Sequence, residues 1–206
     1  MGNNFLKDRI LKQSYEDFYV EAKDKFEMKW EVDAKNTAVK EEYIILEQLE
    51  MGQFGKGVLV QHKKNKSSFV MKMLDKDKIL KSGYLKTLLK EKRILQAANF
   101  PFIFNLLFHF KENEKVFMLY EYRTKIDINF SNLIRFEACS EKVCRFYSAQ
   151  IILALEYLHR VGIIYRDLTP QNILVDGMGY IRIREVSGNI IGQIRYIYIC
   201  FLNNVK

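Results

Sequence analysis

The C-terminal half of the sequence contains a carboxylate and a carboxamide five residues apart in one short segment. The segment is YRDLTPQN at 165–172, and apolar stretches that we predict to be strands flank it. Asp167 can accept or orient a hydroxyl proton, and Asn172 can offer its amide oxygen to a hard cation such as Mg²⁺. These two groups are the minimum needed to transfer a phosphoryl group to an alcohol. A turn without catalytic function is the alternative interpretation.

Two charged residues stand on elements that are otherwise apolar. Lys72 lies in the predicted strand FVMKML, and Glu91 shares a helix face with Leu88 and Leu95 at spacings of three and four. A charge in an apolar environment is retained when an opposite charge or a ligand neutralises it. We therefore predict an ion pair between Lys72 and Glu91 that presents the ammonium group to an anion. The alternative is that both side chains extend separately to solvent.

A turn with three glycines precedes this strand. The segment LEMGQFGKG at 49–57 would let backbone N–H groups approach a phosphate closely. An apolar strand, VLVQ, follows it, so the segment lacks the helix N-terminus that P-loop and dinucleotide-binding folds supply. We predict a β-hairpin flap over phosphates. A hairpin turn that binds no ligand has the same sequence pattern.

These segments require a scaffold of both helices and strands. The helical period predicts an amphipathic helix over 15–30, with an apolar stripe of Phe18, Ala22, Phe26 and Trp30. A second helix is predicted over 84–98, and Ser140 and Gly162 bound a long one over 140–160. The predicted strands cover 43–49, 58–61, 68–74, 103–110, 116–122, 163–165, 173–175 and 180–184. The pattern indicates an α+β fold whose first half is mostly antiparallel sheet.

Composition and charge restrict the class of protein. Of 206 residues, 49% are hydrophobic and 28% are charged, which is typical of a globular protein. The net charge is +8, but residues 1–50 carry 8 Lys and Arg against 12 Asp and Glu, while residues 51–100 carry 12 against 3. The lysines of 51–100 are spaced along turns and helix faces, so we predict a solvated face and no nucleic-acid partner. Three cysteines without metal-ligand spacing predict a cytoplasmic or nuclear location. Residues 1–14 are polar and charged and no long apolar run follows, so we expect no signal peptide and no stable membrane insertion.

Further segments resemble eukaryotic protein kinases, and within them the cAMP-dependent kinases of the AGC type. They are KWE at 29–31, EKRILQA at 91–97, NFPF at 99–102 and RFY at 145–147, and they accompany the glycine turn, strand lysine, helix glutamate and catalytic loop in the family's order. The resemblance implies an antiparallel β N-lobe with one regulatory helix, plus an incomplete helical C-lobe. It divides the chain into an N-terminal helix (1–40), the N-lobe (41–122), a partial C-lobe (123–187) and an unrelated apolar tail (188–206).

The resemblance also implies ATP and Mg²⁺ as cofactors and assigns roles to single residues. Asp167 would be the catalytic base, and Lys72, oriented by Glu91, would contact the ATP phosphates. Asn172 and Glu185 would bind the metal. The remaining nucleotide-binding positions would be Gly52, Gln53, Phe54 and Gly55 in the flap, Glu121 and Arg123 at the hinge that holds adenine, and Leu49 and Leu174. Protein partners of the kinase family are expected, but binding to the regulatory subunit is not.

Four positions depart from the kinase pattern. Glu50 replaces the first flap glycine, and Gly57 stands where a valine usually covers adenine. Thr169 replaces the catalytic-loop lysine, and Glu185 replaces the aspartate of Asp-Phe-Gly. A carboxylate near the phosphates repels them, and loss of a preorganised charge costs about 10² to 10³ in rate. We expect a Ser/Thr kinase that is truncated after the Asp-Phe-Gly position and impaired in catalysis. An active kinase for basic substrates and a non-catalytic interaction fragment are the alternatives.

Overall fold

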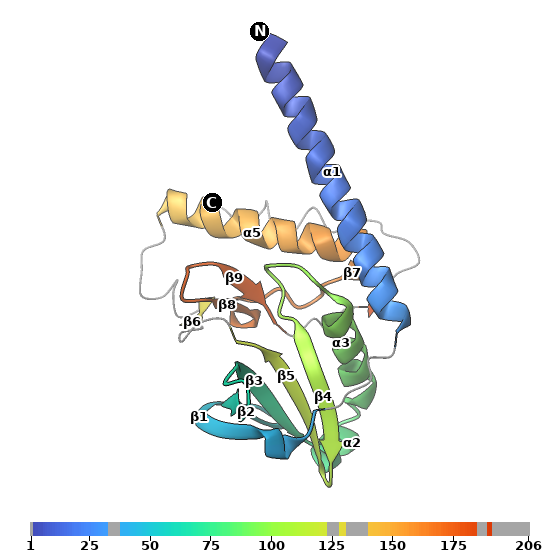
Figure 1. Cartoon of the computed structure of the whole chain (residues 1–206), viewed down its shortest axis with the longest axis vertical. Coiled ribbons are helices and arrows are strands. Elements are labelled where there is room, and N and C mark those ends of the chain that lie inside the picture. The colour runs from blue at the N-terminus through green and yellow to red at the C-terminus, as the bar shows by residue number, and fades with distance from the viewer. Residues whose placement is uncertain (1, 33–37, 123–127, 131–139, 185–188, 191–206) are drawn as a thin grey trace.

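The computed structural model describes residues 2–32, 38–122, 128–130, 140–184 and 189–190. A long helix leads into a five-stranded sheet with two further helices beside it, and a second part contains another long helix and short strands (Figure 1). These two parts correspond to the predicted N-lobe and partial C-lobe, so the predicted fold class is confirmed. Within the described ranges, no helix is long and apolar enough to span a membrane.

The first part is built on an antiparallel sheet. Its strands are β1 (Tyr43–Met51), β2 (Gly55–His62), β3 (Ser68–Asp75), β4 (Leu106–Glu112) and β5 (Lys115–Glu121), in the order β1-β2-β3-β5-β4. Asn113, with a φ of 44°, allows the two-residue turn between β4 and β5. All five strands were predicted, but β1 and β2 extend further and meet at the glycine turn.

Two helices connect β3 to β4. The helix α2 (Lys76–Lys81) was not predicted, because six residues are too few to show a helical period. It begins where the Asp75 side chain accepts a hydrogen bond from the Lys78 backbone N–H, at 3.0 Å. Gly83, with a φ of 70°, separates it from α3 (Leu85–Ala97). The helix α3 confirms the predicted helix to within one residue at each end.

The second part contains the helix α5 (Glu141–Arg160) and short strands. The Ser140 hydroxyl accepts from the Val143 backbone N–H at 3.4 Å, and Gly162, with a φ of 78°, follows the helix as predicted. The strands are β6 (Ile128–Asn129), β7 (Ile163–Ile164), β8 (Ile173–Val175), β9 (Ile181–Ile183) and β10 (Asn189–Ile190). They form a β6-β8-β9 sheet and a β10-β7 pair. Ile103 bridges to Ile183 and so connects the two parts.

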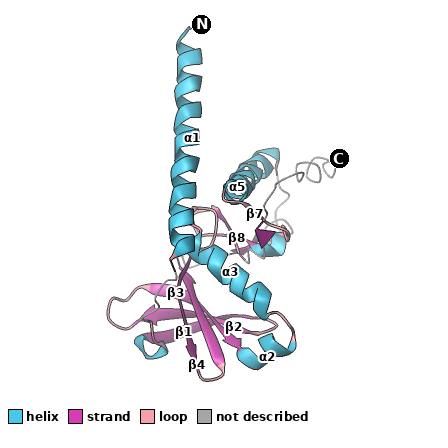
Figure 2. Ribbon diagram, turned by 90° about the vertical axis from the view of Figure 1, so that its right-hand side faces the viewer, coloured by secondary structure: helices cyan, strands magenta, loops and turns pink. Residues whose placement is uncertain are grey.

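The N-terminal helix α1 (Gly2–Glu31) contacts both α3 and α5. In Figure 2 its N-terminal portion extends past α5 and away from the sheet. The predicted apolar stripe was wrong at one position: Phe18 is 47% exposed, whereas Tyr19 is 2% exposed. The Tyr19 ring lies 6.2 Å from the Phe100 ring, and its hydroxyl donates to the Leu153 carbonyl at 3.4 Å. The buried stripe is therefore Tyr19, Ala22 and Phe26, at steps of three and four.

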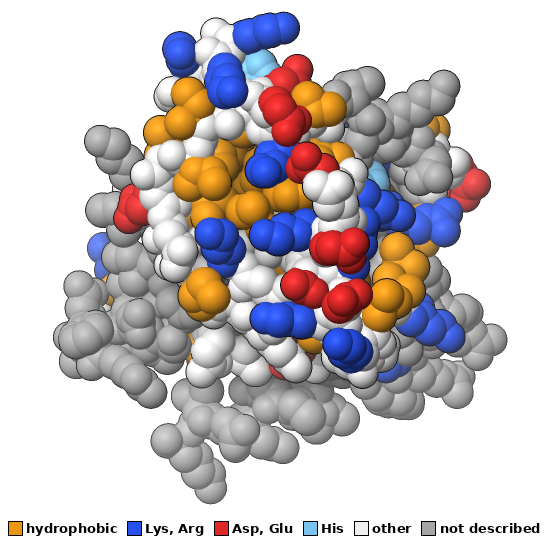
Figure 3. All heavy atoms as spheres, turned by 90° about the horizontal axis from the view of Figure 1, so that it is seen from below, with side chains coloured by type: hydrophobic (Ala, Val, Ile, Leu, Met, Phe, Trp, Pro, Cys, Tyr) orange, Lys and Arg blue, Asp and Glu red, His pale blue; other side chains and the backbone are white. Residues whose placement is uncertain are grey.

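Positive charge does not gather in one place on the face at the sheet end of the molecule. Figure 3 shows Lys and Arg side chains on this face beside Asp and Glu side chains and exposed apolar ones. Mixed charge of this kind is typical of a solvated surface. It favours the prediction that the basic excess of residues 51–100 is a solvated face.

Candidate active site

The glycine turn between β1 and β2 forms a flap that is anchored on the end of β3. The Gly52 N–H donates to the Gly55 carbonyl, and the Asp75 N–H donates to the Phe54 carbonyl, each at 2.8 Å. A Cβ atom on Gly55 would lie 1.9 Å from the Met73 carbonyl oxygen, so only glycine fits there. The predicted hairpin is confirmed, and its role over phosphates stays a prediction.

A cavity of about 250 Å³ lies beneath this flap, between β3, β5 and α3. It brings together six of the residues that the sequence predicted to bind nucleotide, namely Gly52, Gln53, Phe54, Gly55, Lys72 and Glu91. Residues from four separate segments thus meet at one place, in the arrangement that a phosphate-binding site would need.

The two predicted charges line this cavity from different elements. The Lys72 ammonium, on β3, lies 5.7 Å from the centroid of the Tyr120 ring. Glu91, on α3, is only 4% exposed, and one of its carboxylate oxygens accepts a hydrogen bond from the Tyr84 hydroxyl at 3.1 Å. A buried carboxylate needs such partners because desolvation of an unpaired charge is costly. The direct ion pair between Lys72 and Glu91 stays a prediction.

Asp167 and Asn172 contact each other in the predicted catalytic loop. The Asn172 amide nitrogen donates to the Asp167 carboxylate at 2.8 Å and to the Asp167 carbonyl at 3.0 Å. A short 3₁₀ helix (Pro170–Asn172), which begins after Thr169, turns the chain between the two residues so that their side chains meet. Because the amide nitrogen faces Asp167, the amide oxygen of Asn172 is the atom that suits a metal. Asn172 is buried and Asp167 is exposed, so the loop presents its carboxylate to solvent or substrate.

The end of β9 lies against this loop. The Arg184 N–H donates to the Asn172 carbonyl at 2.9 Å, and the Tyr165 hydroxyl donates to the Arg184 carbonyl at 3.0 Å. Glu185, the second predicted metal ligand, follows Arg184 in sequence and lies outside the described residues. Among the residues that are described, no group of three or more His, Cys, Asp and Glu side chains could hold a metal ion. Of the two predicted metal ligands, the described residues therefore include Asn172, and its binding of Mg²⁺ stays a prediction.

A buried arginine on β9 contacts the predicted hinge at the end of β5. Arg182, on β9, is 1% exposed and donates to the Glu121 carbonyl at 3.1 and 3.4 Å. It lies opposite Leu174 on β8, and its guanidinium is 4.2 Å from the Phe104 ring. Of two other predicted nucleotide-binding residues, Leu49 is 45% exposed on β1, and Arg123 lies outside the described residues.

Tyr84, Tyr120 and Arg182 are among the residues of this region that the sequence reasoning missed. Tyr84 and Tyr120 line the cavity, and Arg182 contacts the hinge. Two of them carried a signal. Tyr84 precedes Glu91 by seven residues and so falls on the same helix face, and Arg182 is a single charge in an apolar strand, as Lys72 is.

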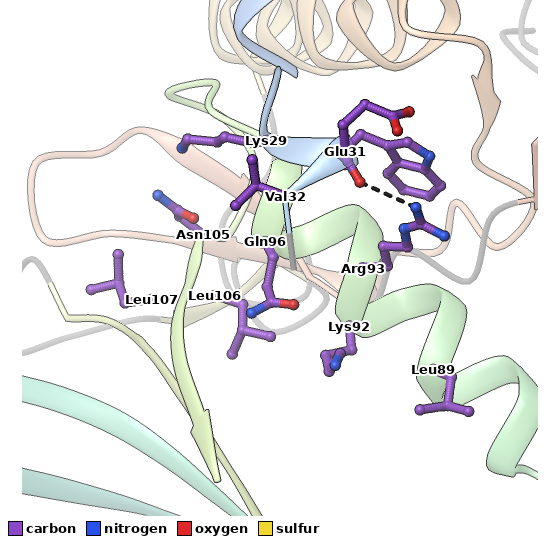
Figure 4. A pocket seen from close by; sticks show the side chains of 11 residues that line it. Lys29, Glu31, Val32, Leu89, Lys92, Arg93, Gln96, Asn105, Leu106 and Leu107 are labelled. Carbon is purple, nitrogen blue, oxygen red and sulfur yellow. Dashed lines mark hydrogen bonds between the residues drawn. The ribbon is translucent and has the colours of Figure 1, made fainter. Parts of the chain in front are cut away.

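A larger cavity, of about 570 Å³, lies at the junction of α1, α3 and β4 (Figure 4). The Arg93 guanidinium donates to the Trp30 carbonyl at 3.1 Å and lies 4.3 Å from the Trp30 ring. Lys92 and Gln96 contact the two ring nitrogens of His109 at 3.1 and 2.9 Å. These contacts join α1 to α3 and α3 to β4, and they use a different face of α3 from the one that carries Leu88 and Glu91.

Comparison with known proteins gives a consistent result. Residues 43–185 match the family model described as protein kinase domain. The chain is 38% identical over 134 residues to the cAMP-dependent protein kinase catalytic subunit of Dictyostelium discoideum, covering 65% of this chain and 20% of that protein. It is 38% identical over 149 residues to the serine/threonine-protein kinase sgk-1 of Caenorhabditis elegans, covering 71% and 32%. It is 35% identical over 161 residues to the cAMP-dependent protein kinase catalytic subunit 2 of Drosophila melanogaster, covering 78% and 45%. The chain thus spans less than half the length of each of these relatives.

The matched region contains the whole five-stranded sheet, the flap, α3, α5 and the catalytic loop. Cyclic-AMP-dependent kinases and other AGC-type serine/threonine kinases are among the relatives. Since the family model covers more than half of the chain and the two lobes have the expected architecture, this chain belongs to the protein kinase family.

Proposed function

We propose that this chain carries the nucleotide-binding and catalytic-loop portion of a serine/threonine protein kinase in which phosphoryl transfer is impaired. The observation that carries the proposal is that some of the family's catalytic residues are retained in this chain while others are substituted. Lys72 and Glu91 line the cavity beneath the flap, and Asp167 and Asn172 contact each other. Thr169 and Glu185 occupy positions where the family's pattern has a lysine and an aspartate.

The residues that are retained support weak binding of ATP. The flap backbone and the Lys72 ammonium face a cavity large enough for phosphate groups. Asn172 and Glu185 would hold Mg²⁺, which neutralises charge on the phosphates when it is bound. Glu50 opposes binding, because it replaces the first glycine of the flap with a negatively charged residue, and negative charge repels phosphates.

The substituted residues support a large loss of rate. Asp167 can orient a hydroxyl group, but Thr169 offers no positive charge to the transferred phosphoryl group. Glu185 has one methylene more than aspartate, and Mg²⁺ tolerates little error in ligand geometry. If each change costs about 10² to 10³ in rate, two of them together reduce transfer by several orders of magnitude, even though such effects are not strictly additive.

An assay with radiolabelled ATP tests the proposal on the purified full chain. Mg-ATP and a basic serine peptide are supplied, and label transferred to the peptide is compared with label transferred by Asp167→Asn. The expected result is no difference between the two proteins. Turnover by the natural sequence that Asp167→Asn abolishes would contradict the proposal and establish the active kinase instead.

A further inference from the structure

Tyr84 links the tip of the flap to the buried carboxylate on α3. Its ring stacks on the ring of Phe54, with centroids 4.7 Å apart and planes inclined by 20°. Its hydroxyl donates to Glu91 at 3.1 Å. All three side chains line the cavity of about 250 Å³. One side chain therefore contacts both the flap and the residue predicted to orient Lys72.

The backbone at Tyr84 fixes the direction of this side chain. Its N–H lies 3.2 Å from both the Ile79 carbonyl and the Ser82 hydroxyl oxygen, and the Ser82 hydroxyl also donates to the Ile79 carbonyl at 2.8 Å. Its own carbonyl accepts from the Leu88 N–H at 3.0 Å and starts α3. Tyr84 is thus part of the rigid joint between α2 and α3.

The flap end of the contact is also fixed. The Phe54 carbonyl accepts from the Asp75 N–H at 2.8 Å, and Gly55 packs against the Met73 carbonyl too closely for any side chain. The stacked rings therefore join two elements that are each anchored by backbone contacts.

We propose that Tyr84 is a positioning residue that holds the flap closed over the cavity and couples its opening to Glu91. A ligand that lifts the flap must separate Phe54 from Tyr84, and its phosphates must offset the loss of that stacked pair. Movement of Tyr84 also withdraws a hydrogen bond from the Glu91 carboxylate. The ligand class, a nucleoside triphosphate, rests on the proposed function, whereas the coupling rests on these contacts alone.

Amide hydrogen exchange on the full chain tests the coupling without any ligand. The Asp75 N–H donates to the Phe54 carbonyl, so its exchange rate reports opening of the flap tip. Tyr84→Ala removes the stacked ring, and we expect this rate to rise roughly two- to tenfold. Tyr84→Phe is the matched control, because it keeps the ring and loses only the hydroxyl; the rate at Asp75 should stay within about twofold of the natural protein.

Two further measurements keep the test decisive. The buried amides of Ala154 and Leu158 in α5 should not change, which separates flap opening from general destabilisation. If Tyr84→Ala does not fold, Phe54→Leu removes the same stacking from the flap side. Equal exchange at Asp75 in the natural protein and in Phe54→Leu or Tyr84→Ala overturns the proposal. Additive effects of Tyr84→Ala and Phe54→Leu on the Asp75 exchange rate would also overturn it, since the two variants remove one shared contact that can be lost only once.

Slower exchange of the Asp75 amide in the presence of Mg-ATP tests the ligand separately from the coupling. Protection in the natural protein supports a nucleoside triphosphate as the ligand. If Mg-ATP protects neither protein while Tyr84→Ala still accelerates exchange, the proposed ligand is wrong and the coupling stands. If Mg-ATP protects the natural protein but Tyr84→Ala exchanges at the same rate as that protein without ligand, the coupling is wrong and the nucleotide site stands.

Discussion

At the scale of single residues, the burial of the Glu91 carboxylate makes protein stability depend on its partners. Glu91 is an almost fully buried carboxylate on an apolar helix face, beside the Tyr84 hydroxyl and across one cavity from Lys72. Removing one partner of a buried charge leaves the other uncompensated, which is usually worse than removing both. The coupling between Lys72 and Glu91 is therefore measurable as a difference between single and double variants.

We predict that Lys72→Met and Glu91→Gln interact in a double-mutant cycle. The expected coupling in the free energy of unfolding is about 1–3 kcal/mol, because Glu91 is buried and Lys72 is half-buried. Urea unfolding of the four proteins measures it. Strictly additive single effects would show that the two charges do not pair.

A second residue-scale prediction concerns the buried hydroxyl of Tyr157. Its ring stacks on Phe100 at 4.7 Å, and its oxygen accepts from the Asn99 N–H at 3.1 Å. Burial raises the pKa of this hydroxyl to about 12, although the hydrogen bond from Asn99 acts to lower it. Tyr157→Phe should lower the free energy of unfolding by about 0.5–1.5 kcal/mol, the net value of one hydrogen bond. Tyr180→Phe, at an exposed ring, is the control; equal effects at both positions would contradict the assignment.

Local patterns made part of the site predictable. The inward-facing position of Glu91 follows from spacing along one helix, which the sequence displays directly, whereas the hydrogen bond between Asn172 and Asp167 emerges only from the structure of the loop. Tyr84 and Arg182 act on segments far away in sequence, the flap and the hinge. No periodicity within their own segments identifies those partners, so their roles could not be predicted.

At the scale of elements, one arginine makes several of the contacts that hold α1 on α5. The Arg160 guanidinium binds both carboxylate oxygens of Glu16, at 2.7 and 3.1 Å, and the Glu156 carboxylate at 3.0 and 3.1 Å. It also lies 4.6 Å from the Tyr19 ring. The hydrogen bond from Arg160 lowers the pKa of Glu16, and the same contact raises the pKa of Arg160.

We predict that the docking of α1 on α5 weakens in acid. The ordinary pKa of Glu16 is 4.5, and its value in the folded protein is lower. The contact therefore stabilises docking at pH values above 4.5 and is lost as the pH falls below 4.5 through the folded value. The protection of the α1 amides, taken relative to the intrinsic exchange rate at each pH, should fall over this range in the natural protein, and Glu16→Gln should remove that pH dependence.

The variant Arg160→Gln should accelerate exchange along α1 already at pH 7. Arg145→Gln is the matched control, since Arg145 pairs with Glu141 within α5 and, in the part of the chain that the structure describes, joins α5 to no other element. Faster exchange along α1 in Arg145→Gln to the same extent would show that the effect comes from α5 itself and not from the contact between helices.

The elements differ in how far the sequence predicted them. The helices α3 and α5 and the strands of the sheet were predicted closely, because each repeats its pattern over several residues. The helix α1 was predicted only from residue 15, although it begins at Gly2. The helix α2 and the two-residue strands β6 and β10 were not predicted, because they exist through capping and pairing with distant segments. The error at Phe18 has a similar cause: Tyr19 is the buried residue and donates a hydrogen bond to the Leu153 carbonyl of α5, a distant partner that a period of four does not reveal.

At the scale of the whole molecule, the cavity beneath the flap and the catalytic loop belong to different lobes. The flap, Lys72 and Glu91 come from the sheet and α3, whereas Asp167 and Asn172 come from the segment between β7 and β8. Arg182, on β9, spans the two parts through the Glu121 carbonyl at the end of β5. A ligand of the proposed site must contact both lobes.

We predict that this site binds Mg-ATP weakly. At about 1 mM nucleotide the gain in the free energy of unfolding should be below about 0.5 kcal/mol, which corresponds to a Kd near or above that concentration. Glu50→Gly should increase the gain by removing a repelling carboxylate, and Lys72→Met should abolish it. Thermal unfolding with and without Mg-ATP measures all three proteins. A large gain in the natural sequence that Lys72→Met leaves unchanged would place nucleotide binding elsewhere.

Restoring the two substituted catalytic positions tests most directly the proposal that they impair phosphoryl transfer. Thr169→Lys combined with Glu185→Asp returns the charge that faces the transferred phosphoryl group and the shorter metal ligand. In an assay that counts label transferred from Mg-ATP to peptide, to the protein itself and to water, this variant should exceed the natural sequence by about 10² or more, and Asp167→Asn should remove the gain. A natural sequence already as fast as the restored variant, or a restored variant that binds Mg-ATP and stays inert, would contradict the proposed function.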